Sequence, residues 1–519
     1  GVIALPVVRQ FLLSCALAAL LLAHSTESLA RDEGAQGRPR IGLVLAGGGA
    51  KGAAHIGVLR LLEELRIPVD CVAGTSMGAL IGATYASGVG PSDIEESVVG
   101  IDWTATIGGK GRRQRAPIQT KLAGRSQSGG LEFGISNGEL RSSNSLVAGQ
   151  DVEDTIRNLV ANSRLTQDFD DLPIPFRAVA TDLLAGEMVI MDSGDLATAM
   201  RASMSLPGFF APVATEDGRL LADGGLMRNL PIDIARDLCA DVVIAVWMST
   251  PEPGANDLGS ALSVLVRSMG VMVGANETAQ IASLTDSDIG IEVEMGDIAT
   301  EDFQRVAEAI ALGDEAAKQH RDALSRFSVP EAEYAAWLQS VRRDGALRTQ
   351  IDEIRVVGLE RVNPDFVRSR ITRTQAGSSV SSESITGDLQ SIYALGDFEK
   401  IDYQIVSDGD SKVLEIQPVE KSWGPDFLRL DAGLSMSGSG GIEAILRADH
   451  DRSWINRRGG HWHNALQIGS ESSLQSDFYQ PIDLQQRFFV QPVFYLESDL
   501  EDIYIEGDRV ARYRFEQLY

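Results

Sequence analysis

Apolar residues follow strand and helix periodicities in alternation between residues 39 and 330. Short continuous apolar runs, which are typical of buried parallel strands, are separated by segments with apolar residues at helical spacing. The predicted strands are Ile41–Ala46, Asp70–Ala73, Phe176–Thr181, Leu220–Asp223 and Asp241–Met248. The predicted helices are Ala53–Leu65, a helix that ends at Ala86, Glu301–Phe327 and Glu331–Arg343. This order predicts an α/β domain with a mainly parallel sheet and helices on both faces.

Residues 105–147 interrupt the alternation with a segment rich in Gly, Ser and cationic side chains. Such a segment is expected either as a loop over a functional site or as a solvated loop. Residues 331–350 are expected to form a helical linker, and from residue 351 the element order changes. The expected strands are Ile351–Val357, Phe398–Val406 and Lys412–Val419, and the expected helices are Pro364–Ile371 and Ser382–Leu395. The order βααββ predicts a small separate α+β domain over residues 351–420.

Apolar and polar residues alternate one by one between residues 424 and 519. In the first such stretch, Leu428, Leu430 and Ala432 fall on one face, and Arg429 and Asp431 fall on the other. Further strand-like runs with aromatic residues are Ile442–Ala448, Trp462–Ile468, Phe488–Leu496 and Ile503–Tyr513. This pattern is compatible with the wall of a membrane β-barrel and with a soluble β-sandwich.

The first 30 residues have the pattern of a secretory signal peptide. Arg9 precedes the uncharged apolar run Phe11–Ala23, and the small-residue site Ser28–Ala30 follows it. The run is shorter than the ~20 residues of a typical transmembrane helix. Residues 1–30 are therefore expected to be removed on export, and residues 31–38 to form a polar linker.

Composition restricts the possible functions. The 519 residues include 46 Lys and Arg against 73 Asp and Glu, a net charge of −27, and 44% are hydrophobic. The negative charge argues against non-specific nucleic-acid binding, and the apolar content excludes global disorder. The chain has three Cys, of which Cys15 lies in the signal sequence. Cys71 and Cys239 lie in apolar stretches and are expected to be buried thiols.

A candidate nucleophile lies between the predicted strand Asp70–Ala73 and the helix that follows. Gly74-Thr75-Ser76-Met77-Gly78 matches the G-x-S-x-G pattern, whose glycines permit the sharp turn that exposes the Ser oxygen. A Ser hydroxyl needs a base to become a nucleophile. The histidines of this region, His55 and His320, lie within predicted helices, where packing or solvation explains them. The other candidate base is Asp223, at the end of an apolar strand and before two glycines.

A glycine-rich turn follows the first predicted strand. Gly47, Gly48 and Gly49 present backbone N–H groups just before a helix, which suits an oxyanion hole. The same turn also matches the G-x-G-x-x-G pattern of dinucleotide-binding proteins, for which Asp70 is the candidate ribose ligand. A P-loop is excluded because Lys51 precedes Gly52. No cluster with metal-ligand spacing accompanies these motifs, so neither metal nor cofactor is expected.

Three motifs together resemble the patatin-like phospholipases. They are Ala46–Gly52 (AGGGAKG), Gly74–Gly78 (GTSMG) and Asp223–Gly225 (DGG), and the segments Ala202–Val213 and Asn229–Pro231 add to the likeness. The resemblance covers residues 39–330. It implies a Ser76–Asp223 catalytic dyad without a catalytic His, an oxyanion hole at Gly47–Gly49, and hydrolysis of phospholipid or other acyl-ester substrates.

The C-terminal part resembles a POTRA domain followed by the start of an outer-membrane β-barrel. The domain order is similar to that of the fused patatin autotransporters of Gram-negative bacteria. It implies export through the fused barrel, the barrel-assembly machinery as partner, and a hydrolase domain at the cell surface or released. The alternative is an outer-membrane transport or assembly protein that carries the α/β domain as passive cargo. About five strands are too few to close a barrel, so the sequence is expected to be a fragment of a longer chain.

Overall fold

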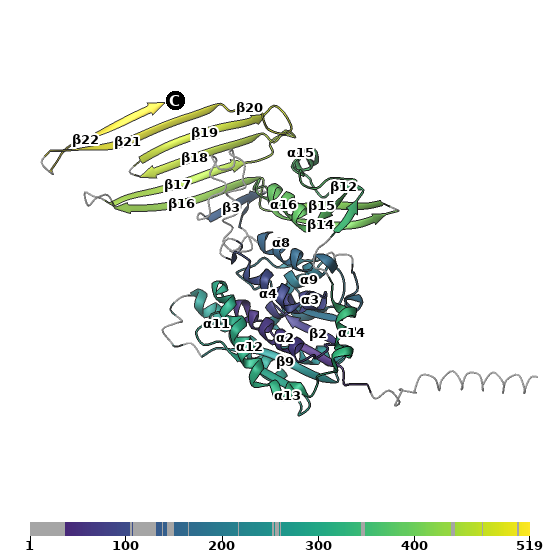
Figure 1. The fold of residues 1–519 in the computed structure, drawn as a ribbon. Coiled ribbons are helices and arrows are strands. Elements are labelled where there is room, and N and C mark those ends of the chain that lie inside the picture. Colours follow the sequence, from purple (N-terminus) through teal and green to yellow (C-terminus); the bar gives the residue numbers. More distant parts are fainter. Residues whose placement is uncertain are drawn as a thin grey trace, which may run out of the picture. The chain divides into compact units, whose positions relative to one another are not determined.

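The computed structural model describes most of the chain beyond residue 36 (Figure 1). The described residues are 37–103, 106, 131–136, 139–142, 150–163, 166–215, 217–251, 254, 259, 261–343, 348–409, 411–436, 442–469, 471–505 and 508–518. The predicted signal peptide, residues 31–36 of the linker 31–38, and most of segment 105–147 lie outside them. Residues 1–40 and 41–519 are separate units, and the described helices and strands all belong to the second.

The second unit contains helices and strands throughout its described length. The helices are α2 Ala54–Glu64, α3 Met77–Ala86, α4 Pro91–Val99, α8 Gln150–Leu159, α9 Leu196–Ser203, α10 Ile232–Leu238, α11 Ala261–Ile281, α12 Val306–Gln319, α13 Arg321–Ser325, α14 Glu331–Val341, α15 Pro364–Arg368 and α16 Ser382–Tyr393. The strands are β1 Ile41–Leu45, β2 Cys71–Thr75, β3 Leu131–Ser136, β4 Glu139–Ser142, β5 Phe176–Asp182, β6 Glu187–Met191, β7 Val213–Ala214, β8 Leu220–Asp223, β9 Val242–Ser249, β10 Ile289–Glu294, β11 Arg348–Ile351, β12 Glu353–Val356, β13 Ser378–Ser381, β14 Phe398–Asp408, β15 Ser411–Glu420, β16 Asp426–Met436, β17 Ile442–Arg452, β18 His461–Gly469, β19 Glu471–Pro481, β20 Phe489–Val490, β21 Val493–Ile505 and β22 Asp508–Leu518.

The N-terminal sheet is parallel in its centre and antiparallel at one edge. Its strand order is β10-β9-β1-β2-β5-β8-β7, with β6 also paired to β5. The pairs from β10 to β5 are parallel, whereas β8 runs antiparallel to β5 and β7 to β8. The carboxyl ends of β1 and β2 therefore lie side by side, which brings the two glycine motifs that follow them together.

Both faces of this sheet are buried against helices, which explains why its strands are continuous apolar runs. Alternate residues of β1 belong to different cores: Leu43 and Leu45 pack with α2, α3 and α12, whereas Val44 packs with α10. The α/β domain with a mainly parallel sheet that was expected from the sequence is confirmed, and its antiparallel pairs lie at one edge. The predicted helix 301–327 is in fact a 3-10 turn followed by α12 and α13.

Residues 348–420 form a small α+β unit. The strands β12, β15 and β14 make a three-stranded sheet, with β12 parallel to β15 and β14 antiparallel to it, while β11 pairs with β13. The expected order βααββ is found in β12, α15, α16, β14 and β15, but the short strands β11 and β13 were not predicted, and β13 lies between the two helices. This unit contacts α8, where Gln150 exchanges two hydrogen bonds with the backbone of Ile401 and the buried Arg157 pairs with Asp402.

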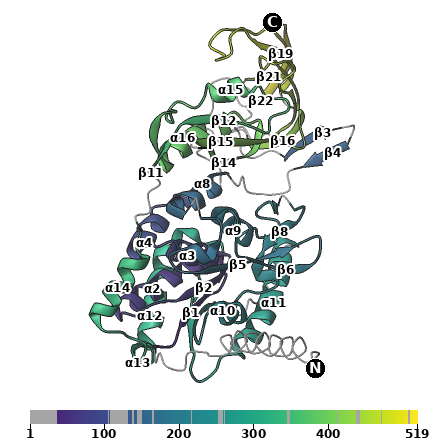
Figure 2. The same ribbon diagram turned by 90° about the vertical axis from the view of Figure 1, so that its right-hand side faces the viewer.

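The last part of the chain is a large antiparallel sheet of order β22-β21-β19-β18-β17-β16-β3-β4. The strand β19 was not predicted, and the expected strand 503–513 covers the end of β21 and the beginning of β22, which are two separate strands. The hairpin β3–β4 comes from the segment expected to be a loop. Residues Leu131–Ile135 pair with Asp426–Leu430 of β16, and Figure 2 shows the hairpin beside that strand. A segment within the α/β region of the sequence therefore extends the C-terminal sheet.

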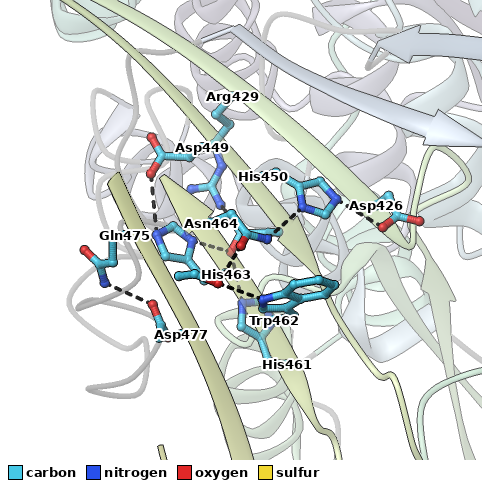
Figure 3. Close-up of polar contacts among 12 residues, drawn as sticks. Asp426, Arg429, Asp449, His450, His461, Trp462, His463, Asn464, Gln475 and Asp477 are labelled. Carbon is cyan, nitrogen blue, oxygen red and sulfur yellow. Dashed lines mark hydrogen bonds and ion pairs between the residues drawn. The ribbon is translucent and has the colours of Figure 1, made fainter. Parts of the chain in front are cut away.

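The two faces of this sheet have the opposite polarity to that of a soluble sheet, because the exposed face is apolar and the buried face is polar. One face carries apolar side chains that are 41–57% exposed: Leu430, Leu446, Trp462, Leu466, Ile468, Leu474, Phe494 and Leu496. The other face buries Arg429, Asp449, Asp451, His461, His463 and Asp477. Asp451 pairs with Arg429 and accepts hydrogen bonds from Nε2 of His461 and Nδ1 of His463, each at 2.9 Å. Figure 3 shows His463 beside Asp449, with its Nε2 3.6 Å from Oδ1 of that carboxylate.

The expectation that Cys71 and Cys239 are free thiols is wrong. They form a disulfide bond with a Cα–Cα distance of 6.1 Å and a sequence separation of 168 residues. Cys71 is the first residue of β2, and Cys239 directly follows α10. Helix α10 packs on the sheet close to β2, so two residues that are far apart in sequence become neighbours.

Candidate active site

Ser76 lies at a sharp turn between β2 and α3. Its φ of 53° and ψ of −123° are unusual for a residue with a side chain. The turn brings α3 against the end of β1, where a Cβ on Gly78 would lie 2.1 Å from the carbonyl oxygen of Leu45. Only glycine fits there. The sequence motif therefore has the strand–turn–helix context that a nucleophile elbow requires.

Asp223, at the end of β8, contacts Ser76 directly. The Ser76 hydroxyl donates a hydrogen bond to Oδ2 of Asp223 at 2.8 Å, and the Gly225 N–H donates to Oδ1 at 2.8 Å. Asp223 is only 6% exposed. Burial raises the pKa of Asp223 to about 6, and the hydrogen bonds from Gly225 and Ser76 oppose that increase. A carboxylate with this pKa is a suitable proton acceptor near neutral pH.

The loop Gly47–Gly49 lies beside the Ser76 turn. A Cβ on Gly47 would lie 2.6 Å from Oδ1 of Asn229 and 3.0 Å from Cβ of Ser76, so this loop approaches the nucleophile as only glycine allows. The N–H of Gly47 is donated to the carbonyl of Asn229 at 3.3 Å. The donors next along the loop are the N–H groups of Gly48, which precedes the 3-10 turn Gly49–Ala53, and of Gly49, its first residue.

Helix α11 holds the loop that follows Asp223. Asn276 accepts from the N–H of Asn229 at 2.7 Å and donates to the carbonyl of Gly225 at 2.9 Å. The Asn229 side chain donates to Glu277 at 2.5 Å. Burial raises the pKa of Glu277 and lowers that of Lys51, and the attraction between the two charges opposes both shifts. No sequence signal had indicated α11 as part of this site.

The two histidines of the domain bond elsewhere. His55 is completely buried, and its Nε2 lies 2.8 Å from the carbonyl oxygen of Ala46. Burial lowers the pKa of His55 to about 4, so the ring is neutral at pH 7. His320, at the end of α12, bonds the carbonyl of Ala316 in its own helix at 3.0 Å. The hydrogen bonds of both rings therefore go to backbone carbonyls, whereas the Ser76 hydroxyl bonds Asp223.

Asp70 does not lie where a dinucleotide ribose would need it. Its carboxylate accepts a hydrogen bond from the N–H of Ile41 at 2.6 Å, at the amino end of β1. The glycine loop is at the opposite, carboxyl end of the same strand, which is where α/β sheets bind nucleotides. This geometry argues against the dinucleotide-binding hypothesis.

Ser203, at the end of α9, contacts the nucleophile's backbone. Its Oγ accepts a hydrogen bond from the Ser76 N–H at 2.8 Å, and its side chain is completely buried. The sequence motif Ala202–Val213 contained this residue but gave it no role.

Among the described residues, no group of His, Cys, Asp or Glu has the arrangement of a metal site. Within the same residues, no helix has both the length and the apolar character needed to cross a membrane.

Comparison with known proteins identifies the domain that carries this site. Residues 43–236 match the family Patatin-like phospholipase. A patatin-like phospholipase domain-containing protein of Caenorhabditis elegans is 37% identical over 225 residues, which are 43% of this chain and 15% of the relative. The rat patatin-like phospholipase domain-containing protein 7 is 36% identical over 225 residues, with the same two shares. The chain therefore contains a patatin-like phospholipase domain, as the sequence motifs predicted.

A bacterial relative is matched over a larger share of its own length. An uncharacterized NTE family protein of Mycobacterium tuberculosis is 36% identical over 216 residues, which are 42% of this chain and 51% of that protein. This chain thus spans between 15% and 51% of the length of these three relatives. Among solved structures, VipD from Legionella pneumophila is similar with a TM-score of 0.32 and 18% identity, covering 55% of this chain and 67% of that one.

Proposed function

We propose that this protein is a lipid acyl hydrolase, a phospholipase A or lysophospholipase-type serine esterase, in which Ser76 and Asp223 act as a catalytic dyad. The observation that carries the proposal is the 2.8 Å hydrogen bond from the Ser76 hydroxyl to the buried Asp223 carboxylate. The sequence match to the patatin-like phospholipase family supports the substrate class.

The reaction follows from this contact. Asp223 accepts the proton of the Ser76 hydroxyl while Oγ attacks the ester carbonyl carbon, which gives a tetrahedral intermediate. The intermediate collapses to an acyl-enzyme, and the leaving alcohol takes the proton from Asp223. Water then attacks the acyl-enzyme, and Asp223 first accepts a proton from the water and then returns one to Ser76. The fatty acid leaves and the free enzyme is restored.

The glycine loop is proposed to stabilise the negative charge that develops on the carbonyl oxygen. Since the N–H of Gly47 is already donated to Asn229, the N–H groups of Gly48 and Gly49 are the proposed oxyanion donors. Gly47 contributes by allowing the loop to approach Ser76 closely. Neither this loop nor the dyad requires a metal ion.

Labelling with a fluorophosphonate probe tests the proposal. The parent chain is expected to be labelled and to hydrolyse a soluble ester, while Ser76→Ala is expected to do neither. The matched control is Ser87→Ala, since Ser87 lies at the other end of α3, is buried, and donates its hydroxyl to the carbonyl of Thr84. Labelling that persists in Ser76→Ala would assign the nucleophile to another residue.

For the C-terminal part, we propose that residues 351–420 are a POTRA domain and that the antiparallel sheet belongs to an outer-membrane barrel through which the hydrolase domain is exported. An exposed apolar face opposite a buried polar face is the arrangement of a barrel wall in lipid. The Cys71–Cys239 disulfide supports export, because disulfides persist in oxidising compartments. The barrel-assembly machinery is then the expected partner, and the hydrolase domain lies at the cell surface or is released.

The competing function is transport or assembly at the outer membrane with the α/β domain as inert cargo. The two hypotheses differ in one measurement, since inert cargo has no need of an intact Ser76–Asp223 contact. Ester hydrolysis by the full chain, lost in Ser76→Ala, favours the enzyme. Recovery of the protein in washed outer membranes, with the α/β domain accessible to external protease, tests the barrel and export proposals separately.

A further inference from the structure

We propose that the turn at the end of α9, residues Ala202–Ser205, positions both members of the Ser76–Asp223 pair, and that Ser203 is the positioning residue for the nucleophile. This inference rests on the proposed function, because it assigns a role in that reaction. It adds a residue that touches neither the reacting carbonyl nor the proton that moves.

The first contact fixes Ser76. The Ser203 hydroxyl oxygen accepts the Ser76 N–H at 2.8 Å. Ser76 has a positive φ of 53°, a conformation that persists only when its surroundings impose it. The Ser203 side chain is completely buried, so removing its hydroxyl would leave the Ser76 N–H pointing at a buried site without an acceptor. Buried backbone N–H groups in proteins are almost always hydrogen-bonded. The hydrogen bond to Ser203 therefore stabilises the turn in the conformation that directs Oγ of Ser76 toward Asp223.

The second contact fixes Asp223, and it comes from Ser205, which lies two residues after Ser203 in the same turn. The N–H of Asp223 is donated to the carbonyl of Ser205 at 2.9 Å. The Ser205 side chain is anchored in turn, because its hydroxyl oxygen accepts from Arg201 at 2.6 Å and donates to the Arg201 carbonyl at 2.9 Å. Arg201 is itself buried and donates to the carbonyl of Ala211 at 3.2 Å.

One rigid turn thus sets the separation between the two reacting side chains. Ser76 and Asp223 lie at the ends of different strands, β2 and β8, which are not neighbours in the sheet because β5 lies between them. A hydrogen bond of 2.8 Å between their side chains demands that the strand ends keep a fixed distance. Displacement of a reacting group by about 1 Å can cost about a hundredfold in rate. Losing the Ser203 contact is therefore expected to act on kcat.

The test compares Ser203→Ala and Ser203→Thr in the full chain, with a soluble ester and a fluorophosphonate probe. Ser203→Ala is expected to lower kcat by roughly 10- to 100-fold, with KM within about twofold of the parent, and to slow phosphonylation of Ser76 by a similar factor. Ser203→Thr keeps the accepting oxygen and is expected to recover most of kcat. Should Ser203→Ala not fold, Ser203→Cys gives the same comparison with a similar size and a much weaker acceptor.

Ser87→Ala is the matched control, because it removes a buried Ser hydroxyl from the same domain away from the dyad. It is expected to keep the parent's kcat even if its melting temperature falls as far as that of Ser203→Ala. A Ser203→Ala variant that keeps more than half of the parent's kcat overturns the inference, as does an equal loss of kcat in Ser87→Ala. Absence of hydrolysis and of labelling in the parent itself would instead overturn the proposed function.

Discussion

The substitution Asp223→Asn is expected to change activity and stability in opposite directions. Asn has the shape of Asp, and its side-chain oxygen still accepts the Gly225 N–H. It cannot accept the proton of the Ser76 hydroxyl, so ester hydrolysis should fall by at least about 100-fold, the lower range for loss of a general base. The fold should survive, because the variant side chain keeps the volume and one hydrogen bond of the original.

The effect on stability follows from the pKa of Asp223. Burial raises that pKa from 3.8 to about 6 in the folded protein. Between pH 3.8 and about 6 the folded state binds more protons than the unfolded state. The free energy of unfolding therefore falls as pH rises through this window. Above about pH 6 the buried charge of Asp223 exerts its full destabilising effect. A shift of about two units corresponds to about 3 kcal/mol. Asp223→Asn carries no charge, so it should be more stable than the parent by up to ~3 kcal/mol at pH 8 and no more stable at pH 3.

Two assays check this reasoning. The kcat/KM of the parent for a soluble ester should rise with pH to a plateau, with its midpoint near 6, because the base must be ionised. Activity at pH 5 should then be about one tenth of the plateau value. The second assay measures the midpoint of thermal unfolding of parent and variant at pH 8 and pH 3. A pH profile that is flat from 5 to 8, near-parent activity in the variant, or a variant less stable at pH 8 would refute the assignment of Asp223 as a buried base.

Three further outcomes are expected. His320→Ala should keep activity within about twofold, because its ring bonds the carbonyl of Ala316 in its own helix; a large loss would turn the dyad into a triad. Hydrolysis of a soluble ester should be unaffected by a chelator, and activity that disappears with chelator and returns with one particular ion would contradict a metal-free mechanism. Replacing both Cys71 and Cys239 with Ser should destabilise the domain by up to about 5 kcal/mol on a loop-entropy estimate, seen as a lower melting temperature; an unchanged value would show that the bond contributes nothing.

Local patterns in the sequence predicted the central strands of the α/β sheet and the motifs of the site, but not the helices α4, α8, α9, α10 and α11. Apolar runs predicted β1, β2, β5 and β9, because a strand buried on both faces needs apolar residues throughout. The G-x-S-x-G motif predicted a turn at Ser76, because only glycine lacks the Cβ that would clash with the neighbouring strand end. The alternation after residue 424 predicted strands, since successive side chains of a strand point to opposite faces.

Tertiary structure alone decided which distant residues meet. The disulfide joins Cys71 to Cys239, and the nucleophile's N–H bonds Ser203, 127 residues away. The hairpin β3–β4 pairs with β16, which lies far along the chain, beyond the whole α/β domain. These contacts depend on how helices and strands pack, and they leave no periodicity in the residues that make them. A sequence pattern reports the burial of a residue within its own element, whereas the identity of its partner depends on the fold as a whole.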